Sequence, residues 1–185
     1  MKRLGRRQAL MGLGVMLAGC TPEQKAVTQS NAAAVSGQKL TRVLIGIWTG
    51  VARLTEAQNA SLLQPDELKR AFDAKWPPLG IAVEVVDANG APESGGPALT
   101  AANARFRSTQ FLFLQTGRYH TRGLFIRDYE IDARIYEGAS RKLIWRATTE
   151  LPDFWRASHT PVDRPVAADR YVDSLTAKLR EDGLI

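Results

Sequence analysis

Two stretches of this 185-residue chain alternate between apolar and polar side chains, and this alternation constrains the fold more than any other feature of the sequence. Between residues 125 and 135 the odd positions read Phe, Arg, Tyr, Ile, Ala and Ile, whereas the even positions from 128 to 134 read Asp, Glu, Asp and Arg. Odd positions are again apolar further on, at Leu143, Trp145, Ala147 and Leu151. Because successive side chains of a strand point to opposite faces of a sheet, both stretches predict strands with one dry and one wet face.

A turn at Gly138-Ala139-Ser140 would join these strands into an antiparallel hairpin. Facing residues must then share the same parity, because one face of each strand is buried. A two-residue turn at Gly138-Ala139 would place Ile135 opposite Lys142, and we reject it for that reason. The predicted pairs are Ile135 with Leu143, Ala133 with Trp145, and Asp132 with Arg146.

The remaining elements follow from hydrophobic periodicity and from the positions of proline and glycine. Short apolar runs predict strands at residues 42–48, 81–86 and 111–114. A helix should begin at Pro65, with Leu68, Phe72 and Trp76 on one core-facing side, and a last helix should follow Pro165. Weaker helical patterns occupy residues 54–63 and 99–107.

This order of elements predicts an α/β (α+β) sandwich, in which helices pack on one mixed sheet of about five strands. Crossover connections make the first strand pairs parallel, and the last three strands form an antiparallel meander. At about 150 residues per domain, we expect one domain, residues 41–185.

The N-terminus has the layout of an export signal. A basic segment, Met1 to Arg7, precedes the apolar run from Ala9 to Ala18, and Gly19 and Cys20 follow. Ten apolar residues are too few to cross a hydrocarbon core about 30 Å thick. We therefore interpret residues 1–19 as a signal peptide.

The sequence Leu17-Ala18-Gly19-Cys20 resembles the lipobox of bacterial lipoproteins. The resemblance implies cleavage between Gly19 and Cys20, and acyl chains such as palmitate on Cys20. Each buried methylene contributes about 0.8 kcal/mol, so these chains would anchor the protein stably in a membrane. An ordinary signal peptide with an incidental cysteine is the alternative.

The sequence also bears on the route and the location. Arg6 and Arg7 are similar to a twin-arginine export signal, with Sec export as an equal alternative because Gly5 stands where Ser or Thr is usual. Thr21 follows Cys20 where an Asp would resemble an inner-membrane retention signal, so we favour the outer membrane and a periplasm-facing domain. Residues 20–40 are small and polar, and predict a lipidated flexible tether with a root-mean-square end-to-end distance of about 25 Å.

The net charge of +6 and the pI of 9.8 do not predict nucleic-acid binding. Four of the 25 basic residues lie in the leader, which has no acidic residue, so the rest of the chain contains 21 basic and 19 acidic residues. A basic stripe on the folded domain is therefore not expected. One cysteine and two histidines are a poor supply for a zinc site, and no glycine-rich phosphate loop follows a strand. We predict no metal, no cofactor and no nucleic-acid partner.

The stretch from Ile131 to Ala147, with Leu-Ile-Trp-Arg in its second half, resembles the hairpin of small Gram-negative envelope lipoproteins. The C-terminal residues 168–185 are similar to the closing helix of those proteins. The families include auxiliary lipoproteins of ABC-type transporters and uncharacterised outer-membrane lipoproteins, with curli-secretion lipoproteins as more distant relatives. The resemblance implies a fold and a compartment, but its motifs supply no binding or catalytic residue.

Candidates for catalysis are few. Ser158 and His159 are adjacent, and neighbours in a chain rarely point at each other as a nucleophile and its base must. His120 follows Arg118-Tyr119 at a strand end and is interpreted as a polar surface group.

Three carboxylates share one strand face and could bind Ca²⁺ or transfer protons: Asp128, Glu130 and Asp132. Arg127 and Arg134 are interleaved with them, and Arg146 faces them. This pattern favours a salt-bridged solvent face, so we expect no catalytic residue.

The sequence therefore favours a non-enzymatic docking or assembly module, anchored in the membrane and accessory to an envelope transport or secretion complex. The candidate contact surfaces are an exposed edge strand and the loop with Trp155 and His159. Packing of Trp155 under the last helix is the alternative for that residue. The alternative function is a small-molecule or lipid carrier with an apolar pocket, and a hydrolase is a third, less favoured class.

Overall fold

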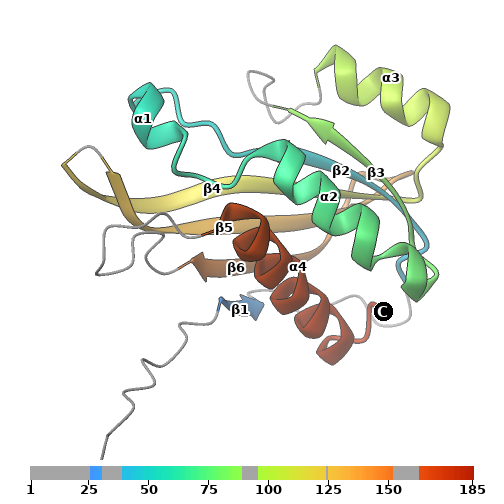
Figure 1. Ribbon diagram of the computed structural model, residues 1–185. Helices are drawn as coiled ribbons and strands as arrows, with labels where there is room; N and C mark the ends of the chain where they lie inside the picture. The colour runs from blue at the N-terminus through green and yellow to red at the C-terminus, as the bar shows by residue number, and fades with distance from the viewer. Residues whose placement is uncertain (1–25, 31–38, 89–95, 124, 152–162) are drawn as a thin grey trace, which may run out of the picture.

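A computed structural model describes residues 26–30, 39–88, 96–123, 125–151 and 163–185 (Figure 1). Its centre is one six-stranded sheet with the order β1-β6-β5-β4-β2-β3. The strands are β1 Val27–Ser30, β2 Arg42–Trp48, β3 Ala82–Asp87, β4 Gln110–Arg122, β5 Phe125–Glu137 and β6 Leu143–Leu151. The helices are α1 Glu56–Asn59, α2 Pro65–Lys75, the 3-10 helix η1 Pro77–Leu79, α3 Pro97–Phe106 and α4 Arg164–Glu181.

The sheet is mixed, as the order of elements predicts. β2 pairs in parallel with both β3 and β4, whereas β4, β5 and β6 form an antiparallel meander. The sixth strand, β1, pairs antiparallel with β6 and lies inside the segment predicted as a flexible tether. Its four residues, Val-Thr-Gln-Ser, show too short an apolar pattern to predict a strand. Polar contacts attach it instead, because the Thr28 hydroxyl lies 2.8 Å from that of Thr149 and 2.7 Å from that of Ser174.

The register of the β5–β6 hairpin differs from the predicted one by two residues. The structure pairs Ile135 with Trp145, Ala133 with Ala147, and Asp132 with Thr148. The predicted parity holds in this part, but the partners were wrong. A bulge between Ile135 and Tyr136 adds one residue on β6, Ile144, and the connection runs to Lys142. Leu143, predicted to be buried, is therefore 41% exposed, and Ile144 is buried in its place.

β4 is much longer than the predicted strand at 111–114, because its second half is polar and has no apolar run. It forms a long hairpin with β5 whose pairing shifts between His120 and Thr121. This shift reverses the predicted parity at the start of β5, so Ile126 is buried and Arg127 is exposed.

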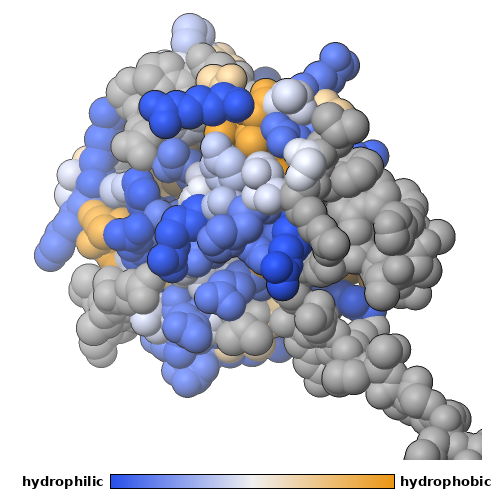
Figure 2. Space-filling view, turned by 90° about the vertical axis from the view of Figure 1, so that its left-hand side faces the viewer, coloured by the Kyte–Doolittle hydropathy of each residue, from blue (hydrophilic) through white to orange (hydrophobic). Residues whose placement is uncertain are grey.

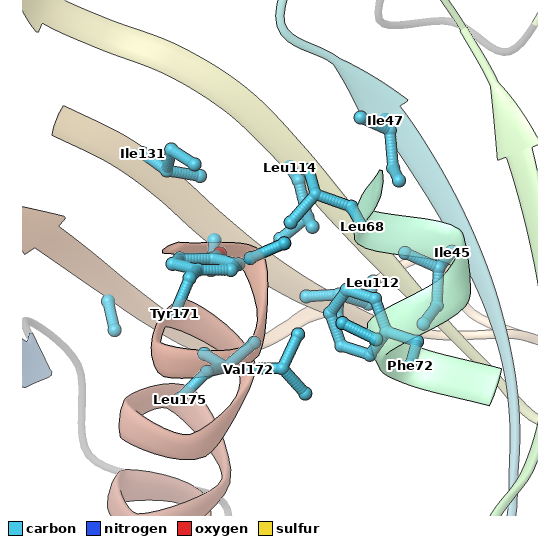
Figure 3. Close-up of a cluster of buried hydrophobic side chains, with 14 of the residues drawn as sticks. Ile45, Ile47, Leu68, Phe72, Leu112, Leu114, Ile131, Tyr171, Val172 and Leu175 are labelled. Carbon is cyan, nitrogen blue, oxygen red and sulfur yellow. The ribbon is translucent and has the colours of Figure 1, made fainter. Parts of the chain in front are cut away.

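Helices α2 and α4 cover the face of the sheet that carries the odd residues of β5. The predicted stripe of α2 is fully buried, with the rings of Phe72 and Trp76 in edge contact at 4.8 Å between centroids. Trp76 Nε1 donates to the Thr176 hydroxyl of α4 at 3.0 Å, and Trp145 Nε1 donates to Asp182 just after α4 at 2.7 Å. Figure 3 shows side chains of α2, α4 and the central strands filling the space between them.

Helix α3 packs on the opposite face, over β2 and β3. Gly46 of β2 allows this close approach, since a Cβ there would lie 3.1 Å from the Phe113 ring and 3.2 Å from the Leu99 side chain. Among the described residues, helices thus cover both faces of the sheet at its β3 end and one face at β6.

Substitution of Trp145 by Ala should lower the free energy of unfolding by about 3–5 kcal/mol, because it removes a fully buried aromatic side chain. Leu143→Ala, in the same strand, is the matched control and should cost much less, since Leu143 is partly exposed. Urea unfolding followed by circular dichroism measures both. Equal losses would contradict the bulged register.

Candidate functional site

The face of β4, β5 and β6 that points away from α2 and α4 carries polar side chains. Within the described part of the chain, α3 is the helix on this side, and it lies over β2 and β3. We call the remainder the open face, and define it by Gln115, Glu130, Asp132, Arg134, Arg146, Thr148 and Glu150. The sequence predicts this surface correctly as the wet side of the β5–β6 pair.

Asp132 is the centre of the open face. Its Oδ2 accepts hydrogen bonds from Arg146 Nη2 at 2.7 Å and from Arg134 Nη2 at 3.0 Å. Its Oδ1 accepts from the Thr148 hydroxyl at 3.0 Å. Asp132 and Arg146 are therefore in contact as expected, although Thr148 rather than Arg146 is the paired residue.

The environment of Asp132 favours its charged form. Burial by itself would raise the pKa of this carboxyl, but the hydrogen bonds from Arg146, Arg134 and Thr148 outweigh burial, and the pKa lies below its ordinary value. The charge is held in place by three donors from β5 and β6, and the side chain is only 13% exposed. Asp132 is thus built as a fixed acceptor and is poorly suited to donate a proton.

The other two carboxylates of the predicted group are also paired. Arg118 of β4 donates from Nε and Nη2 to the two oxygens of Glu130, at 3.1 and 2.8 Å. Asp128 contacts His120 and lies 3.6 Å from Arg127. The salt-bridged face predicted from the sequence is confirmed. In the part of the chain that the structure describes, no group of three or more His, Cys, Asp or Glu residues could hold a metal ion.

Two buried polar atoms on the open face have no hydrogen-bond partner among the described residues: Gln115 Oε1 and Arg146 Nε. Gln115 pairs with Asp132 across β4 and β5, and Arg146 is joined to Asp132 directly. One is an acceptor and the other a donor, so both retain hydrogen-bonding capacity close to the fixed charge. An ordered array of donors and acceptors of this kind suits a polar protein contact better than an apolar ligand.

The predicted edge strand has two counterparts, because β1 and β3 are the outer strands of the sheet that the described residues form. β1 is only four residues long, and β3 is tied to α3 by an ion pair between Glu84 and Arg105. The remaining predicted site residues lie outside the described residues: Arg6, Arg7, Gly19, Cys20, Trp155, Ser158 and His159.

The sequence did not reveal the Arg118–Glu130 pair or the place of Gln115. Both depend on β4 continuing beyond its apolar half. The alternation of Gln115 with the buried Leu114 and Thr116 is the signal that could have extended the strand.

No protein-family model matches this chain, and no curated protein matches it. Among solved structures, the PelC dodecamer from Paraburkholderia phytofirmans is similar at 13% identity, over 82% of this chain and 95% of that chain, with a TM-score of 0.47. The lipoprotein GNA1162 from Neisseria meningitidis has 12% identity, over 78% and 99%, with a TM-score of 0.39. The LpoB C-terminal domain from Salmonella enterica has 9% identity, over 65% and 88%, with a TM-score of 0.31. Similarity at this level does not transfer a function.

Asp132→Asn should lower the free energy of unfolding by about 1–2 kcal/mol at neutral pH, because it weakens charge-assisted hydrogen bonds from two arginines. The pKa of the carboxyl is depressed in the folded state, so its contribution is present above the ordinary pKa of Asp and is lost as the pH falls through the folded value. The difference between wild type and variant should therefore vanish in acid. Asp128→Asn, on the exposed part of the same strand, is the control and should have a smaller effect in urea titrations across pH. A difference that persists in acid would contradict this account of Asp132.

Proposed function

We propose that this protein is a periplasm-facing lipoprotein of the cell envelope, and that it acts without catalysis as a docking or assembly module. Its partner would be an envelope protein complex for transport or secretion. The observation that carries this proposal is the open face, where hydrogen bonds from Arg146, Arg134 and Thr148 hold the charge of Asp132 in a fixed position on the sheet. Fixed, complementary charges give a protein contact its register and its specificity.

The packing of the domain favours docking over the carrier alternative. Side chains of α2, α4 and the central strands that face each other are buried and in mutual contact, among them Leu68, Phe72, Leu112, Leu114 and Leu175 (Figure 3). A lipid or another apolar ligand would have to displace these contacts to enter between the helices and the sheet.

The described polar groups also suit contact better than catalysis. His120 lies on an open hairpin, with 76% of its side chain exposed, and contacts Asp128. Water-excluded surroundings strengthen the electrostatic effects on which catalysis relies, and such surroundings are missing around this exposed side chain. We propose that His159, four residues after Trp155 in the sequence, is likewise not a catalytic base.

The proposed anchor is Cys20, acylated after cleavage at Gly19. The lipobox resemblance supports attachment to a membrane, and Thr21, in the position where an Asp would resemble an inner-membrane retention signal, supports the outer membrane. Export through the twin-arginine route, with Arg6 and Arg7, is compatible with this. None of the helices in the described ranges is long and apolar enough to cross a membrane.

Cys20→Ser should move the protein from the membrane fraction to the soluble periplasmic fraction, because the acyl chains and not the domain surface supply the stable attachment. Fractionation of cells followed by a salt wash and immunoblotting measures this. The control is Thr21→Ser, which leaves the cysteine in place and should keep the protein in the membrane. Sedimentation of the Cys20 variant with washed membranes would show that the anchor is something else.

A further inference from the structure

The position of β1 limits how far the domain can lie from its anchor. β1 begins at Val27, seven residues after Cys20, and a chain of that length spans at most about 25 Å. The predicted tether of residues 20–40 would have allowed a much longer maximum reach. The end of the sheet at which β1 begins must therefore lie close to the membrane that holds Cys20.

That end also carries the turn of the β4–β5 hairpin. β1 begins opposite Glu150, and the neighbouring Leu151 pairs with Tyr129, but β5 begins four residues earlier, at Phe125. Four strand residues add about 13 Å, so the hairpin projects beyond the start of β1. In Figure 1 the turn of the hairpin lies at the far left, β1 lies at the bottom near the middle, and the C-terminus lies to the right of β1.

The hairpin end is basic. Residues 116–127 contain three arginines and one histidine and no acid. Arg118 and Arg127 are 82% and 66% exposed in their side chains. Figure 2 views the molecule from this side, and hydrophilic residues predominate on its described surface.

The acidic neighbours only partly neutralise this charge. Glu130 pairs with Arg118, whereas Asp128 is shared between His120 and Arg127. Exposed ion pairs contribute at most about 1 kcal/mol, so the arginines can exchange a carboxylate for another anion at little cost. A guanidinium binds a phosphate group through two parallel hydrogen bonds, which makes a phospholipid headgroup a suitable partner.

We propose that the turn end of the β4–β5 hairpin faces the anchoring membrane and that Arg118 and Arg127 contact the phosphates of anionic phospholipids there. This orientation rests on the proposed acylation of Cys20. It would direct the opposite end of the sheet, with the β5–β6 turn, away from the membrane.

The orientation can be measured on the full-length acylated protein in vesicles. Cys20 is the only cysteine and is blocked by acylation in this proposal, so one introduced cysteine can carry a fluorophore. Thr121→Cys places the label on the hairpin end, and Ala139→Cys places it on the exposed β5–β6 turn as a control. The vesicles carry a quencher on a lipid headgroup. One set is anionic, made of phosphatidylethanolamine with phosphatidylglycerol, and the other set is neutral, made of phosphatidylcholine.

We expect several-fold stronger quenching at position 121 than at position 139 on the anionic vesicles, and a smaller difference on the neutral ones. Arg118→Gln combined with Arg127→Gln should remove most of the difference without releasing the protein. Arg141→Gln combined with Lys142→Gln, at the other end, changes the net charge equally and should leave it intact. If the double variant unfolds, Arg127→Gln alone takes its place. This single variant keeps the Arg118–Glu130 pair and should also reduce the difference in quenching.

Two results would overturn the proposal in distinguishable ways. The first applies to protein that sediments with the vesicles. The orientation alone is contradicted if quenching is equal at both positions, or if the difference in quenching does not depend on lipid charge and on the arginine variants. Protein that does not sediment with the vesicles contradicts the anchor, and the orientation with it.

Discussion

The structure depends on the burial of one face of the sheet under α2 and α4. The odd side chains of β5 and β6 supply much of this face. One indole hydrogen bond, from Trp145 to Asp182, joins the sheet to the end of α4, and a second, from Trp76 to Thr176, joins α2 to α4. Burial alone would raise the pKa of Asp182, but the hydrogen bonds from Trp145 and Lys178 outweigh it and the pKa lies below its ordinary value. The helices are thereby fixed in position as well as packed.

The opposite face follows from the same alternation. From Asp128 to Ile135 the odd residues of β5 point to the helices, and the even residues on the other side, 128, 130, 132 and 134, are all charged. α3 covers only the β2–β3 side, so Asp132 and its two arginines form a rigid surface on strands held by the core. The domain thus separates the interactions that stabilise it from the surface that we propose for docking.

Much of this could be predicted from the sequence, and the failures have physical causes. The parity of β5 and β6 and the buried stripe of α2 depend on local periodicity, which a sequence displays directly. The partner of Trp145 was wrong because a bulge at Ile144 depends on contacts between strands. β1 was missed because its attachment is a set of hydroxyl contacts, from Thr28 to Thr149 and Ser174, that join residues far apart in the chain. The open face could be predicted as charged, but not the arrangement around Asp132.

The central claim is that the open face acts by contact and not by chemistry. The most direct test is complementation of a deletion strain at matched protein abundance, with variants that leave the core intact. Glu150→Arg reverses an exposed charge on the open face, Asp73→Arg does so on α2 as a control, and His120→Gln with His159→Gln removes both histidines. We predict that the Glu150 variant fails to complement the deletion, and that the Asp73 variant and the histidine double variant complement it fully. Loss of function in the histidine variant at normal abundance, with the Glu150 variant active, would contradict the claim and indicate an enzyme.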